Sequence, residues 1–154
     1  MPKGKKINPF PLQTKTVDGE NHVTLELNDI TSLEGLLFIK NIRTVTHIKT
    51  NRGTTFEDIP EDSFNKLENL TSLTLNLSLQ LKTIRPGAFA GLKNLTTLDL
   101  SYCTRLKTIN PKDLTNLLNL RSLNLKMCYQ LQITKELEDA FAVLRENGCE
   151  VILP

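Results

Sequence analysis

The 154-residue sequence is short of the residues from which most catalytic and metal sites are built. It has no Trp, only two His and three Cys, and an aromatic content of 5%. A zinc site needs closely spaced Cys and His ligands, yet neither a C-x-x-C nor an H-x-x-x-H pattern occurs. Nucleophilic catalysis needs a base beside the nucleophile, and both histidines lie far from the cysteines along the chain. We therefore expect no enzyme, no metal and no cofactor.

Long apolar runs are also missing. No stretch of about 18 apolar residues could span a bilayer, and the basic N-terminus has no apolar core of signal-peptide length. We expect a cytoplasmic protein, or a secreted one if a leader has been removed. The net charge of +2 is too small to draw the whole chain to nucleic acid, although residues 79–132 contain eight Lys or Arg against two Asp.

What the sequence does contain is aliphatic and repetitive. With 39% hydrophobic residues, the chain has the composition of one globular domain, 1–154. Residues 69–93, 94–118 and 119–143 superimpose without a gap at a period of 25. A fourth unit covers 44–68, and a more degenerate fifth covers 21–43. The apolar sites of the fifth unit are Leu25, Leu27, Leu33, Leu36 and Ile42.

The shared pattern, L-x-x-L-x-L-x-x-[S/C]-x-x-L-x-x-I, resembles the leucine-rich repeat family over residues 21–153. Its cysteine spacing is most similar to the cysteine-containing and plant-like variants, whereas IRPGAFAGL (84–92) resembles the extracellular type. In TSLTLN (71–76), Leu73 and Leu75 point to one side of a strand and cannot be buried by that strand alone. Stacking parallel strands about 4.8 Å apart buries them in one core. The expected fold is an α/β solenoid, a short curved horseshoe with a parallel β-sheet on its concave face.

Both ends of such a stack need caps. In the N-terminal cap, residues 1–20, Asp18-Gly19 lies between two β-prone runs and predicts a β-hairpin. In the C-terminal cap, residues 134–154, we predict a helix over 135–147 that begins after Thr134 and ends at Gly148, followed by a strand beside 121–126. The apolar face of this helix consists of Leu137, Ala140, Phe141 and Leu144.

Cys103 and Cys128 are one repeat apart, and Ser78 occupies the same register. We interpret these as small inward side chains that satisfy backbone groups at the turn after each strand. Reduced thiols are the simplest state, with a Cys103–Cys128 disulfide as the alternative. Three Asn-x-Ser/Thr sequons, at Asn69, Asn76 and Asn94, coincide with the repeat template, so they say little about secretion.

The outward strand positions and the turn residues next to the inward column form the predicted binding surface. Contiguous exposed apolar side chains at the turns favour a protein partner. An ordinary solvated face and packing between adjacent turns are the competing interpretations. The predicted partner-binding residues are His47, Lys49, Asn51, Thr74, Asn76, Leu77, Asp99, Ser101, Tyr102, Asn124, Lys126 and Met127.

The resemblance implies a non-catalytic protein-interaction module, and we expect it to be a monomer that binds no nucleic acid. Two tyrosines are too few for base stacking along a basic patch. The alternatives are the recognition arm of a larger enzyme such as a ubiquitin ligase, a secreted bacterial effector, or a ligand-binding ectodomain.

Overall fold

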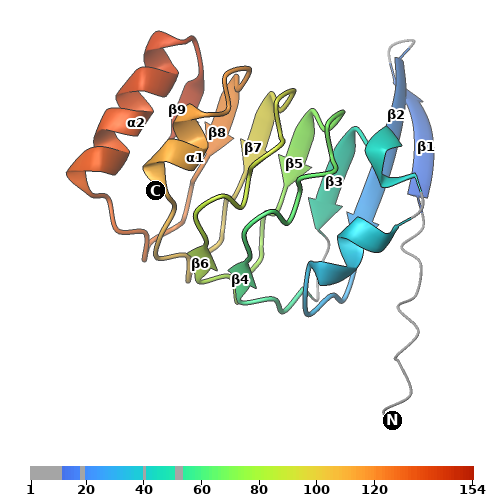
Figure 1. The fold of residues 1–154 in the computed structure, drawn as a ribbon. Coiled ribbons are helices and arrows are strands. Elements are labelled where there is room, and N and C mark those ends of the chain that lie inside the picture. Colours follow the sequence, from blue (N-terminus) through green and yellow to red (C-terminus); the bar gives the residue numbers. More distant parts are fainter. Residues whose placement is uncertain (1–11, 18–19, 40, 51–53) are drawn as a thin grey trace.

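The computed structural model describes residues 12–17, 20–39, 41–50 and 54–154. In this part of the chain, one sheet runs along the whole molecule in the order β1-β2-β3-β5-β7-β8-β9, which confirms the predicted solenoid (Figure 1). Each strand after β2 is parallel to its neighbours and is reached by a return segment on the other side of the sheet. The strands are β1 Leu12–Val17, β2 Glu20–Leu27, β3 His47–Thr50, β5 Ser72–Thr74, β7 Thr97–Asp99, β8 Ser122–Asn124 and β9 Glu150–Ile152.

The register of the sheet reproduces the repeat period. Leu73 of β5 lies beside Leu98 of β7, which lies beside Leu123 of β8. Each of these leucines is fully buried. Burial of one leucine side chain contributes about 1.5–3 kcal/mol, so the inward columns supply most of the stabilising free energy. The apolar sites predicted for the degenerate unit at 21–43 are buried as well.

The convex side is built from short pieces. A two-stranded sheet of β4 (Asp58–Ile59) and β6 (Thr83–Ile84) crosses it, and 3-10 turns η1 (Glu34–Phe38) and η2 (Ile42–Thr44) occupy the first repeats. The repeat at 94–118 forms a short helix instead, α1 (Pro111–Thr115). The Asn110 side chain accepts the Lys112 backbone N–H at 2.9 Å, and Pro111 follows it directly, two features that start helices.

Both predicted caps are present. β1 and β2 pair antiparallel as a hairpin, although its predicted turn, Asp18-Gly19, lies outside the described residues. Helix α2 (Lys135–Glu146) begins where Thr134 Oγ1 accepts the Leu137 N–H at 3.3 Å, and Gly148 follows it at φ +80°. All four residues of its predicted apolar face are buried, and β9 then pairs parallel with β8. Figure 1 shows α2 and β9 together at the C-terminal end of the stack.

Candidate interaction surface

A row of side chains crosses the concave face at the level of the central strands. Lys49, Thr74, Asp99 and Asn124 are direct neighbours on β3, β5, β7 and β8, and all are at least partly exposed. Asp99 Oδ1 accepts the backbone N–H two residues later at 2.9 Å, and Asn124 Oδ1 does the same at 3.1 Å. These contacts hold both side chains in defined orientations where the strands end.

Lys49 is not a free cation. Its Nζ lies 2.7 Å from Glu26 Oε1 on β2, with 54% of the lysine side chain and 19% of the glutamate side chain exposed. An ion pair this exposed contributes at most about 1 kcal/mol. The N-terminal part of the row therefore presents a paired charge to solvent.

His47 lies against His22, a residue that was not among the predicted partner-binding residues. Its ring centroid is 4.4 Å from that of His22, with the two rings nearly perpendicular. Nδ1 of His47 is 2.9 Å from Thr46 Oγ1, which also accepts the Val23 N–H at 3.0 Å. Partial burial, and secondarily the charge of His22, lower the pKa of His47 below its ordinary value. His47 is therefore neutral at pH 7.

A rim of apolar side chains borders the concave face at the turns. We use "the rim" for Leu77, Leu79, Tyr102, Met127 and Tyr129, of which all except Met127 are classed as exposed. The exposed fractions are 46% for Leu77, 38% for Tyr102 and 65% for Tyr129. The Tyr129 hydroxyl donates to Met127 Sδ at 2.6 Å, so the rim is partly ordered by its own contacts.

The backbone of the rim is unusual for its residue types. Leu77, Tyr102 and Met127 have left-handed φ angles of 59°, 60° and 65°. Their turns are held by the next repeat, because the N–H of Leu77 donates to the Ser101 carbonyl at 3.0 Å and that of Tyr102 to the Lys126 carbonyl at 2.8 Å. A left-handed residue other than Gly costs roughly 1–2 kcal/mol. Three consecutive repeats thus carry large apolar side chains where glycine or asparagine would fit with less strain.

The remaining four predicted residues differ in how they are placed. Ser101 is only 5% exposed, so its prediction as an outward contact residue is wrong. By register it lies between Asn76 and Lys126, because the N–H of Leu77 donates to the Ser101 carbonyl and the N–H of Tyr102 donates to the Lys126 carbonyl. Asn76 is half-buried, Lys126 is exposed, and Asn51 lies outside the described residues.

Comparison with known families agrees with this geometry. The family model described as leucine rich repeat matches residues 51–104 and 81–129, which together span just over half of the chain. The chain belongs to the leucine-rich repeat family. The matches do not separate the cysteine-containing subtype from the extracellular one. No curated protein is significantly similar to this leucine-rich repeat chain.

Leucine-rich repeats are typically non-catalytic and mediate contacts between proteins. The thiols of this leucine-rich repeat protein fit that role, because all three cysteines are free and buried. Burial raises the pKa of Cys103 to about 12 and that of Cys128 to about 11, so both are protonated at neutral pH and are poor nucleophiles. Their Sγ atoms donate to the carbonyls of Leu75 and Leu100 at 3.3 and 3.1 Å, as the inward column predicts.

Ser78 departs from this part of the prediction. It is buried in the same column, yet its Oγ has no hydrogen-bond partner among the residues that the structure describes. The inward direction is confirmed at Ser78, whereas the expected backbone contact is not. A shorter C–O bond in place of C–S brings the serine oxygen less far toward the preceding repeat.

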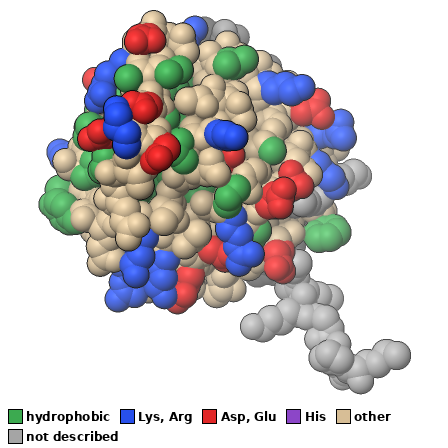
Figure 2. Space-filling view, turned by 60° about the vertical axis from the view of Figure 1, so that its left-hand side comes forward, with side chains coloured by type: hydrophobic (Ala, Val, Ile, Leu, Met, Phe, Trp, Pro, Cys, Tyr) green, Lys and Arg blue, Asp and Glu red, His purple; other side chains and the backbone are tan. Residues whose placement is uncertain are grey.

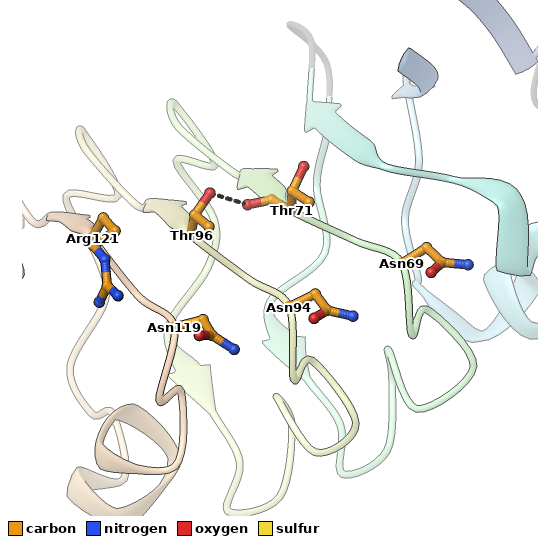
Figure 3. Close-up of a pocket in the computed structure, with 6 residues that line it drawn as sticks. All are labelled: Asn69, Thr71, Asn94, Thr96, Asn119 and Arg121. Atoms are coloured by element: carbon orange, nitrogen blue, oxygen red, sulfur yellow. Dashed lines mark hydrogen bonds between the residues drawn. The ribbon is translucent and has the colours of Figure 1, made fainter. Parts of the chain in front are cut away.

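A polar groove lies at the N-terminal ends of the strands, opposite the rim, and the sequence did not predict it as a site. Figure 3 shows its side chains in two parallel rows, and the volume is about 400 Å³. Asn69, Asn94 and Asn119 each donate Nδ2 to a carbonyl of the preceding repeat at 2.7–2.8 Å. The only early signal was the Asn-Leu dipeptide that opens the units at 69, 94 and 119. The other lining residues are Thr71, Thr96 and Arg121.

This asparagine column explains the two sequons at Asn69 and Asn94. Their threonines are engaged as well, because Thr71 Oγ1 donates to the Thr46 carbonyl at 3.1 Å and Thr96 Oγ1 to the Thr71 carbonyl at 3.0 Å. In this leucine-rich repeat fold, these asparagine and threonine side chains form structural hydrogen bonds between neighbouring repeats.

Charge and hydrophobicity show no single bias on the face of the molecule that Figure 2 presents. On the face turned forward in Figure 2, basic and acidic side chains are interspersed and the hydrophobic ones form separate small patches. No helix in the described ranges is both long enough and apolar enough to cross a membrane. Within the same ranges, no three His, Cys, Asp or Glu side chains are grouped to hold a metal ion.

Proposed function

We propose that this leucine-rich repeat protein recognises a protein partner through its concave face and the rim. The observation that carries the proposal is the left-handed backbone of Leu77 and Tyr102, which places large apolar side chains in solvent at a conformational cost. Folding alone gains little from such side chains. Exposed aromatic and aliphatic groups next to an ordered polar row are the usual anchors of a protein interface.

The row on the concave face supplies the second part of the proposed contact. Thr74, Asp99 and Asn124 offer a hydroxyl, a carboxylate and an amide at a spacing set by the sheet. Such groups add specificity, because a partner that leaves them unpaired after burial is disfavoured by about 1–3 kcal/mol per group. The rim supplies affinity and the row supplies discrimination.

The test is comparative capture of partners from the protein's own cells, followed by mass spectrometry. Wild type is compared with the variant Tyr102→Ala, Met127→Ala, Asp99→Ala. A matched control changes three residues elsewhere, Leu118→Ala, Val143→Ala and Lys112→Ala, all of which are exposed. We expect the first variant to lose specific partners that the control retains. Identical partner sets for all three proteins would contradict the proposed surface.

We also propose that the protein works as a monomer in a reducing, cytoplasmic environment. Three buried free thiols support the reducing environment, because an oxidising compartment favours paired cysteines. The same surface would act as the recognition arm of a larger enzyme, an effector or an ectodomain if a longer reading frame supplies the remaining parts. Sequencing the complete frame and titrating thiols in protein isolated from its own source distinguishes these settings.

A further inference from the structure

We propose that the rim binds an acidic protein segment that carries aliphatic or aromatic side chains. This inference deepens the proposed function and rests on it, since it names the chemistry of the partner for the same surface. It is carried by the charge of the three stacked turns, residues 76–82, 101–107 and 126–132, together with the exposure of the rim.

The three turns contain four cations and no Asp or Glu. Lys82 is already neutralised, with its Nζ 2.8 Å from Glu57 Oε2. Arg105, Lys107 and Lys126 are exposed and form no ion pair with any residue in the described part of the chain. A partner that approaches these turns therefore meets three positive charges without an ion-pair partner, of which Arg105 lies near enough to the Glu57 carboxylate to help Lys82 lower its pKa.

Two of these charges, those of Arg105 and Lys126, lie close to the apolar side chains of the rim. The carbonyl of Lys126 accepts the N–H of Tyr102 at 2.8 Å, which places a lysine beside the central rim residue. Arg105 Nη1 donates to Gln80 Oε1 at 2.7 Å, so its guanidinium reaches back over the turn that carries Leu77 and Leu79. The combination of apolar anchors and adjacent cations matches a segment with alternating carboxylates and apolar groups.

A protein segment fits these features better than a membrane or a nucleic acid does. The rim side chains come from turns rather than from an amphipathic helix, which is the usual element that lies in a membrane interface. Base stacking uses closely spaced aromatic platforms, whereas Thr104 occupies the position between Leu79 and Tyr129 in the stack. Three cations also provide a weak electrostatic footprint for a polyanion.

The experiment is a selection of random dodecapeptides displayed on phage against the full chain, followed by affinity measurements on synthetic peptides. The charge variant is Arg105→Glu, Lys107→Glu, Lys126→Glu. The control variant, Lys93→Glu, Lys112→Glu, Arg145→Glu, makes the same change in net charge at exposed sites away from the rim. Circular dichroism and urea unfolding verify that both variants fold.

We expect the selected peptides to be acidic and to contain Leu, Ile, Phe or Tyr. Their affinity should fall at least about tenfold in the charge variant and less than about twofold in the control variant, and it should weaken as salt is raised. Tyr102→Ala should also weaken binding. Together these results would establish the chemistry of the partner.

Three results would overturn the inference. Neutral or basic peptides whose binding is lost in Tyr102→Ala would retain the proposed function but refute the acidic partner. Binding to phosphatidylserine vesicles or to single-stranded RNA, with no rim-dependent peptide selected, would assign the rim to another class of ligand. Peptides insensitive to both Tyr102→Ala and the charge variant would refute the inference and the proposed surface together.

Discussion

The backbone N–H of Tyr102 donates to the carbonyl of Lys126 at 2.8 Å, so the turn of one repeat is fixed by the repeat that follows it. Tyr102 adopts φ 60° in this turn. The hydrogen bond ties a strained backbone conformation to the stacking of the repeats. Stability and recognition therefore place different demands on the same residue.

Substitutions at Tyr102 should separate these demands. We expect Tyr102→Val to unfold about 1–2 kcal/mol more easily than Tyr102→Asn, because asparagine tolerates the left-handed region and a β-branched residue does not. Both should lose partner binding. Urea unfolding provides the measurement, and the same two substitutions at Tyr129, which lacks a positive φ, serve as the control. Equal stabilities of Tyr102→Val and Tyr102→Asn would contradict the strain.

The buried thiols predict a loss of stability at alkaline pH. Burial raises the pKa of Cys103 from 9.0 to about 12, so above pH 9 the unfolded thiol releases its proton while the folded thiol keeps it. The unfolded state then binds fewer protons, and stability falls with pH by up to about 1.4 kcal/mol per unit for each such thiol. Cys128, with its pKa raised to about 11, acts in the same direction.

The measurement is the free energy of unfolding from pH 8 to 11 under reducing conditions. Wild type should lose stability more steeply than the variant Cys103→Ala, Cys128→Ala, in which the other titrating groups are unchanged. Parallel curves for the two proteins would mean that the thiols ionise as readily in the folded protein as in the unfolded chain.

Two glycines with similar backbones should respond differently to alanine. Gly91 has φ +88°, and a Cβ there would lie 2.9 Å from the Asn65 carbonyl oxygen, a backbone atom that cannot move aside. Gly148 has φ +80° with open space around it. We expect Gly91→Ala to cost about 2–4 kcal/mol and Gly148→Ala about 1 kcal/mol in urea unfolding. Equal losses in the two variants would show that backbone strain outweighs the contact, and a larger loss at Gly148 would contradict the prediction.

His47 should titrate at a lower pH than an unperturbed histidine, whose pKa is 6.5. A lowered folded-state pKa means that the unfolded chain takes up this proton first, so the associated stability is present above pH 6.5 and is lost as pH falls below it. His22→Gln should raise the pKa of His47 by removing the neighbouring positive charge. A titration followed by NMR measures both, and an unchanged His47 in the variant would exclude coupling between the rings.

Much of the fold was predictable because each repeat buries side chains at the same positions as the repeat before it. Leu73, Leu98 and Leu123 align in the sequence and in the sheet, since a parallel stack buries equivalent positions against each other. The caps were predictable for a local reason. Thr134 and Gly148 are start and stop signals that act within a few residues of the helix they bound.

The surface was less predictable. Leu, Tyr and Met carry no signal for a left-handed turn, and the positive φ at the rim comes with hydrogen bonds from the next repeat. The shortened first repeat pairs Thr24 rather than His22 with His47, so the two histidine rings meet diagonally across neighbouring strands. Neither arrangement is encoded within one local window of residues.

The sequence by itself determined the repeat, the side of each strand that is buried and the register of the stack, because these follow from an apolar pattern with a constant period. Only the tertiary structure decided which outward side chains are available. Ser101 and Tyr102 are adjacent in the chain, yet one is 5% and the other 38% exposed. Tyr102 has a left-handed φ of 60°, and its N–H donates to the Lys126 carbonyl of the next repeat, so which side chain faces solvent at this turn depends on the stacking of the repeats.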